Sequence, residues 1–184
     1  MIFPKPYADI VAKLRVPCGF VLVAAFLWLS APTLVSLAAG IPVSLLGLVL
    51  RGWAAGHLEK DSTLTDSGPY AWVRNPLYLG TLATAAGLVI ASRRWELGAL
   101  FAAVFVLIYL PVVDLEEQHL ARLFPAYAGY VKRVSKLIPR WPYPMPEGSD
   151  RHFRWSLYRY NREYQASLGF LTGVALLLWK ALRA

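Results

Sequence analysis

The first apolar run of this chain constrains its fold more than any other feature. From Val16 to Leu50 there are 35 consecutive residues without a charged side chain. One helix needs about 20 apolar residues to cross a bilayer, at about 1.5 Å of rise per residue. The run is therefore too long for one span. Pro32 lies near its middle and predicts the turn of a helical hairpin, because proline lacks a backbone donor.

Three further uncharged runs follow, at residues 75–92, 97–113 and 164–179. Each is short for a span, so we expect tilting of the helices and snorkelling of Arg and Lys at their ends. The last run also fits an interfacial or buried helix. Charged residues make up 16% of the chain, against roughly 25% in soluble domains. The sequence predicts an all-α, polytopic membrane bundle of about five transmembrane helices plus amphipathic interfacial helices. No signal peptide is expected, because residues 1–15 are mixed polar.

The basic residues indicate an orientation. With five spans, one side holds the N-terminus and residues 51–74 and 114–163, which together carry 15 of the 19 Lys and Arg residues. By the positive-inside rule this side is cytoplasmic. We expect an integral membrane protein of a bacterial inner membrane, with its active site facing the cytoplasm. The net charge of +8 then suits anionic membrane lipids, and no nucleic-acid partner is expected.

Cys18 stands alone and the three histidines lack ligand spacing, so no metal site is expected.

Polar residues concentrate in two stretches, residues 51–80 and 114–140. In the first, Gly68 and Pro69 signal a turn, and Pro76 fits the first turn of the third span. Arg74 beside that helix N-terminus is a candidate for holding a carboxylate or phosphate. The alternative is that Arg74 snorkels to lipid headgroups within an aromatic belt of Tyr70, Trp72 and Tyr78.

The second stretch opens with two carboxylates, Glu116 and Glu117, just after an apolar run that ends at Val113. An acid at the mouth of a helix bundle is costly to desolvate and usually has a partner. The alternative is that both face solvent or pair with Arg122 or Lys132. Apolar residues then recur at helical spacing, which predicts an amphipathic helix along the membrane. These residues are Leu120, Leu123, Phe124, Tyr127, Tyr130, Val131 and Val134.

After Pro146, aromatic and apolar residues again share one helical face, with arginines around them. This pattern is typical of an interfacial anchor that leads into the last span, although a lipid-head or partner site also fits it. The face consists of Phe153, Leu157, Tyr160 and Tyr164, and the arginines are Arg151, Arg154, Arg159 and Arg162.

Together the two polar stretches resemble the isoprenylcysteine carboxyl methyltransferase and phospholipid N-methyltransferase superfamily of integral membrane enzymes. STLTDSGPYAWVRNPLY resembles its Thr-Leu, Gly-x-Tyr and Arg-His-Pro-x-Tyr elements, and EEQHLARLFPAYAGY resembles its Glu-Glu and Phe-Gly-x-x-Tyr-x-x-Tyr elements. The likeness covers about residues 51–140. It implies S-adenosylmethionine as cofactor and a lipophilic or prenylated acceptor, with isoprenylcysteine carboxyl O-methylation as the nearest named activity. We therefore expect one membrane domain over residues 1–184, with a helical hairpin at 16–56, a cofactor-binding catalytic core at 57–140 and interfacial and C-terminal helices at 141–184.

The resemblance also implies which residues bind and react. Glu116 can pair with the cofactor's ammonium group, with Glu117 as a second acid, while Arg74 takes its carboxylate. A tyrosine can face the sulfonium or stack on adenine. An amine or hydroxyl acceptor would need a base, for which His119 or a glutamate is the candidate. By motif match the cofactor contacts are Ser62, Thr63, Leu64, Thr65, Tyr70, Asn75, Pro76, Leu77, Tyr78 and Glu116.

Three positions depart from the family pattern. Asn75 replaces a histidine and cannot titrate, Pro125 replaces a glycine, and Val112 replaces the arginine that would recognise a substrate carboxylate. The last departure favours an acceptor other than a carboxylate, such as a phospholipid amine or another lipid-like molecule. Two further alternatives are an NADPH-dependent membrane reductase of the sterol reductase type and a non-catalytic lipid-binding membrane protein.

Overall fold

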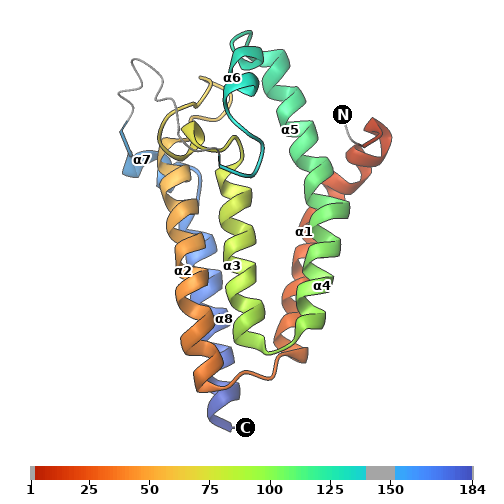
Figure 1. Cartoon of the computed structure of the whole chain (residues 1–184), viewed down its shortest axis with the longest axis vertical. Coiled ribbons are helices and arrows are strands. Elements are labelled where there is room, and N and C mark those ends of the chain that lie inside the picture. Colours follow the sequence, from red (N-terminus) through yellow and green to blue (C-terminus); the bar gives the residue numbers. More distant parts are fainter. Residues whose placement is uncertain (1–2, 140–151, 184) are drawn as a thin grey trace. The chain divides into compact units, whose positions relative to one another are not determined.

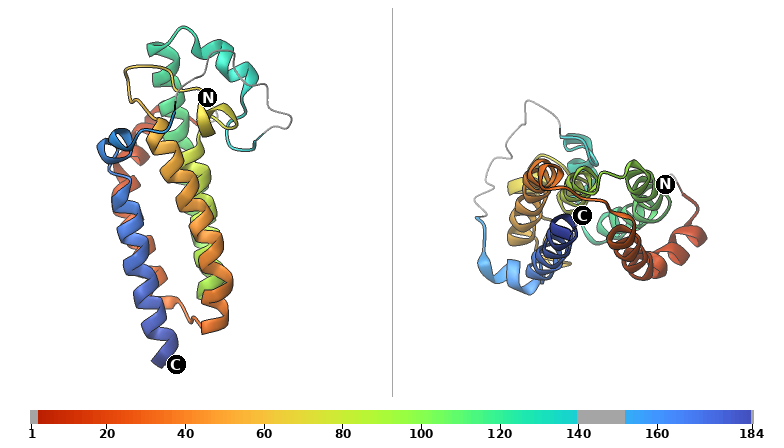
Figure 2. Two further views of the ribbon diagram at one scale, coloured as in Figure 1. Left: turned by 90° about the vertical axis from the view of Figure 1, so that its left-hand side faces the viewer. Right: turned by 90° about the horizontal axis from the view of Figure 1, so that it is seen from below.

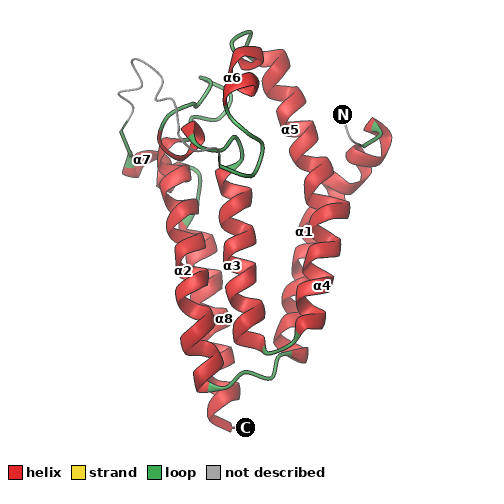
Figure 3. Cartoon of the chain, viewed as in Figure 1, coloured by secondary structure: helices red, strands yellow, loops and turns green. Residues whose placement is uncertain are grey.

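The computed structural model describes residues 3–139 and 152–183. These residues form helices and connecting loops, with no strand among them (Figure 3). The elements, labelled in part in Figure 1, are α1 (Lys5–Leu29), α2 (Leu34–His57), the 3-10 turn η1 (Gly68–Ala71), α3 (Pro76–Ser92), α4 (Trp95–Val104), the π-helical turn η2 (Phe105–Tyr109), α5 (Leu110–Leu123), α6 (Tyr127–Arg133), α7 (Trp155–Tyr160) and α8 (Tyr164–Arg183).

Four helices in the described part of the chain are long and apolar enough to cross a membrane: α1, α2, the continuous helix Trp95–Leu123 and α8. The continuous helix joins α4, η2 and α5. Helix α3 is apolar but shorter, and it corresponds to the third predicted span, residues 75–92. The predicted hairpin turn is present, because α1 ends at Leu29 and α2 begins at Leu34. The predicted all-α membrane fold is confirmed.

The chain divides into two compact units. Unit 1 comprises Met1–Ser44, Ala85–His119 and Leu171–Ala184, and unit 2 comprises Leu45–Thr84 and Leu120–Phe170. Helices α2, α3, α5 and α8 each contribute residues to both.

In unit 1 the small core consists of Leu37, Ala91 and Leu177. Helices α2 and α3 approach closely there, since a Cβ on Gly40 would lie 2.3 Å from the carbonyl oxygen of Gly87. A side chain at either position would force the two backbones apart.

Lysine and tyrosine side chains in unit 1 satisfy backbone carbonyls of helices. Lys180 Nζ of α8 donates to the carbonyls of Leu27 at 2.9 Å and Ser30 at 2.5 Å, which lie at and just beyond the last turn of α1. The Tyr7 hydroxyl donates to the carbonyl of Leu107 at 2.6 Å. Helix α1 accordingly lies beside α4 and η2 (Figures 1 and 2). These bonds matter in a bilayer, where unpaired backbone groups are costly.

Unit 2 is held by a largely buried ion pair. Arg51 of α2 binds both carboxylate oxygens of Glu163, with Nε to Oε1 at 2.6 Å and Nη2 to Oε2 at 3.0 Å. Arg51 Nη1 also donates to the Leu77 carbonyl at 3.3 Å and to the Thr81 hydroxyl, both on α3. The Arg51 guanidinium thus connects α2 to the first turns of α3 and to Glu163, the residue that precedes α8.

Two predicted helices are shorter than their apolar spacing indicated. The predicted amphipathic helix over 120–134 is broken, because α5 ends at Leu123 and α6 begins at Tyr127. Pro125 explains the break, since a residue before proline is disfavoured in helical geometry. The face predicted from Phe153 to Tyr164 is also divided, with Arg162 in the left-handed region at φ 54° between α7 and α8. Arg151 lies outside the described residues.

Candidate functional site

Residues 58–75 connect α2 to α3 and are called here the motif loop. The loop turns at Gly68, whose φ of +57° favours glycine. A Cβ at Gly68 would lie 2.7 Å from the His57 ring, so the close approach also requires glycine. The neighbouring Ser67 places its Oγ 3.3 Å from His57 Nδ1. The Gly68–Pro69 turn predicted from the sequence is therefore fixed against the end of α2.

A carboxylate that the sequence interpretation passed over, Glu59, organises the first half of the motif loop. Its Oε2 accepts from Ser62 Oγ at 3.5 Å and Thr63 Oγ1 at 3.3 Å, and its backbone N–H donates to Thr65 Oγ1 at 3.4 Å. Its Oε1 accepts from Arg154. Three residues predicted to bind the cofactor thus share one acidic neighbour. The sequence did carry one signal of this role. Ser62 and Thr63 follow Glu59 by three and four positions, a spacing typical of local side-chain bonding in loops.

The second half of the motif loop packs on the chain that follows α6. Val73 pairs with Ser135 in a short parallel bridge, and Arg74 N–H donates to the Ser135 carbonyl at 2.9 Å. Asn75 Nδ2 donates to the Lys136 carbonyl at 3.2 Å. The two polar stretches that the sequence singled out therefore meet within unit 2.

Arg74 supplies the C-terminal cap of α6. Its Nη1 donates to the carbonyls of Val131 and Val134, at 3.2 Å each. Helix C-termini carry unpaired carbonyls and partial negative charge, so a cation is stabilising there. Two of the five guanidinium donors are used in this cap. Anion binding by Arg74 stays a prediction, and it would have to use other donors.

Tyr130 forms the buried connection between the two stretches. Its hydroxyl donates to the Tyr70 carbonyl at 2.6 Å, in an apolar cluster formed by Tyr127, Tyr130 and Val134. Leu64 of the motif loop packs against the same cluster. Burial, and next the neighbouring Tyr70, raise the pKa of Tyr130 well above its usual range, so its hydroxyl stays a donor.

The first turn of α3 presents three more of the predicted cofactor residues. Asn75 begins the helix by accepting at its carbonyl from Tyr78 N–H and Leu79 N–H, at 3.1 Å each. Pro76 occupies the first helical position, as predicted. Arg51 donates a hydrogen bond to the carbonyl of Leu77. The sequence interpretation had assigned no role to Arg51.

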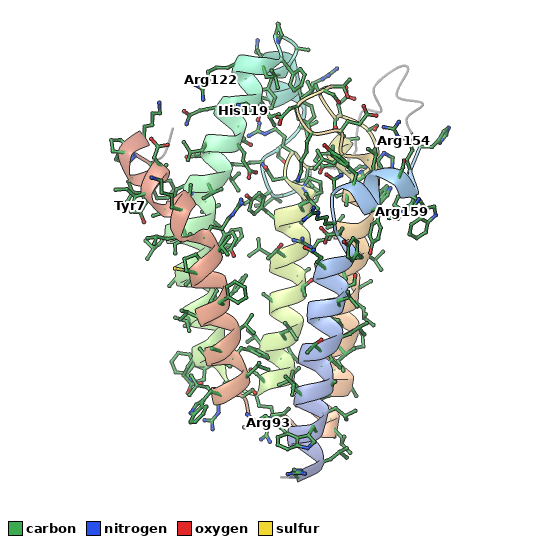
Figure 4. The ribbon with its side chains drawn as sticks, turned by 180° about the vertical axis from the view of Figure 1, so that it is seen from behind. Tyr7, Arg93, His119, Arg122, Arg154 and Arg159 are labelled. Atoms are coloured by element: carbon green, nitrogen blue, oxygen red, sulfur yellow. The ribbon has the colours of Figure 1, made fainter. Side chains whose placement is uncertain are left out.

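The remaining predicted residues lie on α5 in unit 1. Glu116 is exposed, and its Oε1 lies 3.4 Å from Nη1 of Arg15 on α1. The sequence interpretation had not named Arg15 as a partner of Glu116. Glu117 is half-buried and His119 is exposed, and Figure 4 labels His119 on α5. Val112, one helical turn before Glu116, is buried and apolar.

Comparison with known proteins identifies the family. The model of the phospholipid methyltransferase family matches residues 18–127, which is more than half of the chain. The matched residues include the motif loop, α3, and both Glu116 and Glu117. No solved structure gives a significant match.

Three curated relatives have detectable similarity. The chain is 36% identical over 97 residues to the cobalt-zinc-cadmium resistance protein CzcN of Cupriavidus metallidurans, covering 52% of this chain and 45% of that protein. It is 31% identical over 115 residues to the nickel-cobalt-cadmium resistance protein NccN of Alcaligenes xylosoxydans xylosoxydans, covering 61% and 53%.

The third relative is the protein-S-isoprenylcysteine O-methyltransferase of Schizosaccharomyces pombe, 28% identical over 144 residues, covering 75% of this chain and 61% of that protein. The matches thus span roughly half of each relative's length. The family match and this relative agree with the resemblance in the two polar stretches. The chain belongs to the phospholipid methyltransferase family.

Proposed function

We propose that this protein is an S-adenosylmethionine-dependent methyltransferase that acts on a lipophilic acceptor in the membrane. The observation that carries the proposal is the family match over residues 18–127, which includes both the motif loop and the Glu116–Glu117 pair. The relative from Schizosaccharomyces pombe supports the same class of activity.

The donor set of the chain fits this cofactor. Glu116 is an exposed carboxylate, as pairing with an ammonium group requires. Tyr70 and Tyr78 are aromatic groups for the sulfonium or adenine, and Asn75 is an amide donor and acceptor. When bound, S-adenosylmethionine supplies an electrophilic methyl group. The chain's own contribution is then chiefly to hold both reactants in line, because methyl transfer needs little covalent help.

The proposed roles follow the family motifs residue by residue. Cofactor binding is assigned to Ser62, Thr63, Leu64, Thr65, Tyr70, Asn75, Pro76, Leu77, Tyr78 and Glu116, and the chemistry to Arg74, Glu116, Glu117 and His119. If the acceptor is an amine or hydroxyl, the exposed His119 is the proposed base.

We propose a prenylcysteine carboxylate as the first acceptor to test, supported by the relative from Schizosaccharomyces pombe. A phospholipid amine is the second, supported by the family description and by Val112, which puts a buried apolar side chain where a carboxylate would need a cation. The distribution of Lys and Arg supports a site that faces the cytoplasm, and we propose that the membrane is a bacterial inner membrane.

The deciding experiment incubates the purified protein in bilayer nanodiscs with methyl-labelled S-adenosylmethionine and a bacterial lipid extract, and then identifies the labelled product. We expect label in a lipophilic product. Saturable NADPH binding without S-adenosylmethionine binding would instead indicate a reductase.

A variant separates an enzyme from a lipid-binding protein. Glu116→Gln should weaken cofactor binding by at least about 1.5 kcal/mol, the scale of a charged hydrogen bond. Glu96→Gln is the matched control, since Glu96 is an exposed glutamate in the first turn of α4. Equal affinity of the two variants would remove Glu116 from the site.

A further inference from the structure

We propose that Glu59 and Arg154 form a positioning pair that orders residues 58–67 of the motif loop for cofactor binding. The inference rests on the proposed function, since it concerns the loop assigned there to the cofactor. Both residues lie in unit 2, and neither belongs to the set that the sequence motifs identified.

Glu59 is the shared partner of the loop's hydroxyl residues. Its carboxylate accepts from Ser62 and Thr63, and its backbone N–H donates to Thr65, all within six positions after it. The two hydroxyl-to-carboxylate bonds are long, at 3.5 and 3.3 Å, so each contributes weakly and the geometry depends on where the carboxylate is held. The Glu59 side chain is 26% exposed, which leaves its charge partly desolvated and in need of a counter-ion.

Arg154 supplies that counter-ion, and its backbone is anchored independently of Glu59. Arg154 N–H donates to the Gly56 carbonyl at 2.9 Å. The Phe153 ring packs so closely on Gly56 that a Cβ there would lie 2.1 Å from it. Asn161 Nδ2 donates to the carbonyls of Ala55 and Leu58, at 2.9 Å each.

These contacts cap the C-terminus of α2, where unpaired carbonyls need donors. They also fix the segment around α7 beside the start of the motif loop. Arg154 therefore reaches Glu59 from a backbone whose position is already determined. Figure 4 shows Arg154 and Arg159 on this segment, so a neighbouring arginine provides a matched control.

The apolar anchor of the same half of the loop is Leu64, which packs on the cluster around Tyr127 and Tyr130. Asp61 adopts a left-handed conformation with φ of 59°, which aspartate tolerates better than most residues and which marks a turn of the loop. This half of the loop therefore has one apolar anchor, Leu64, and one polar centre to which its hydroxyl side chains bond. Glu59, held by Arg154, is that centre, and it acts through the hydroxyl residues as a positioning residue.

The experiment uses the full chain in nanodiscs of phosphatidylethanolamine and phosphatidylglycerol. Isothermal titration with S-adenosylmethionine compares the wild type with Glu59→Gln, Arg154→Gln, Arg154→Lys and the control Arg159→Gln. We expect Glu59→Gln and Arg154→Gln to raise Kd about tenfold, while Arg154→Lys, which keeps the charge, stays within about threefold of wild type. Arg159→Gln should leave Kd unchanged, because Arg159 is an exposed arginine of α7.

Hydrogen exchange without cofactor provides the second measurement. Residues 58–67 should exchange faster in Glu59→Gln and Arg154→Gln, while α3 keeps its protection and the thermal midpoint changes little. Unchanged exchange in residues 58–67 would overturn the positioning role. Wild-type affinity in both variants would overturn the link to the cofactor. If the wild-type protein binds no S-adenosylmethionine, the proposed function fails together with that link, and exchange still decides whether the pair orders the loop.

Discussion

The Tyr130 hydroxyl donates to the Tyr70 carbonyl across 2.6 Å, and both residues are buried. The bond connects α6 to η1, and so connects the two sequence stretches that carry the family resemblance. Around it, Arg74 caps α6 and Asn75 binds the Lys136 carbonyl. The motif residues therefore stabilise one another, in addition to any contact that they make with a cofactor.

Removing this hydroxyl should weaken unit 2. Tyr130→Phe leaves the Tyr70 carbonyl buried without its donor, which costs about 1–3 kcal/mol of unfolding free energy. A lower thermal midpoint in detergent would show the loss. Tyr160→Phe is the control because Tyr160 is 75% exposed.

The same bond predicts a pH dependence. Because the pKa of Tyr130 is raised in the folded protein, its contribution to stability is full below the unfolded tyrosine value of about 10. Above that pH only the unfolded chain ionises readily at this residue, so stability should fall. Tyr130→Phe should show a shallower decrease in thermal midpoint above about pH 10, and an identical slope in both proteins would contradict the assignment.

The Arg51–Glu163 pair should be costly to break from one side. The side chains of Arg51 and Glu163 are 23% and 9% exposed, so Arg51→Leu would leave a largely buried carboxylate without its cation. We expect a loss of about 3 kcal/mol, with partial recovery in Arg51→Leu/Glu163→Leu. Denaturant titration of the wild type, Arg51→Leu, Glu163→Leu and the double variant measures the coupling. If the losses of unfolding free energy in the two single variants sum to the loss in the double variant, the ion pair itself contributes nothing to stability.

Much of the fold was predictable because its signals are local. The charge-free run around Pro32 predicted the hairpin, and Pro76 predicted where α3 begins. The break after Leu123 was harder, because the apolar spacing continued through Pro125 and favoured one helix. The length of the helix Trp95–Leu123 was also not predicted, since its charged last turns differ in composition from its apolar start.

The candidate site was predictable only where residues match a motif. The motif stretches were identified, but their contact through Tyr130 and Arg74 depends on residues about 60 positions apart. Arg51 was assigned no role, and Arg154 was placed only among the arginines of the interfacial segment. Their partners lie 95 and 112 residues away, and sequence spacing carries no information on such pairs.

We predict that the Tyr7–Leu107 bond compensates for Pro111. Proline has no N–H, so Pro111 cannot donate to the carbonyl four residues earlier, and Tyr7 donates to it instead. Tyr7→Phe should therefore cost about 0.5–1.5 kcal/mol in the native background. In Pro111→Ala, which restores the helical donor, the same change should cost much less. A double-mutant cycle of unfolding free energies measures this difference, and equal costs would show that Pro111 is not the reason for the bond.

Arg15 should compete with the cofactor for Glu116. Its guanidinium lies 3.4 Å from Glu116, and the two side chains are 42% and 48% exposed. An exposed pair contributes about 0–1 kcal/mol, so Arg15→Gln should tighten binding of S-adenosylmethionine by no more than about fivefold. The effect should shrink at high salt. Weaker binding in this variant would mean that Arg15 holds Glu116 in place, the opposite role.

Val112 predicts which acceptor the protein prefers. It is buried on α5 one turn before Glu116, so a carboxylate acceptor would meet an apolar side chain there. If this position selects the acceptor, the wild-type protein should methylate a phospholipid amine faster than the prenylcysteine carboxylate that the relative from Schizosaccharomyces pombe suggests. Val112→Arg should reverse the order, with Val112→Met as the control for size alone. The measurement compares kcat/KM for the two acceptors in nanodiscs. Efficient prenylcysteine methylation by the wild type, unchanged in Val112→Arg, would show that position 112 does not select the acceptor.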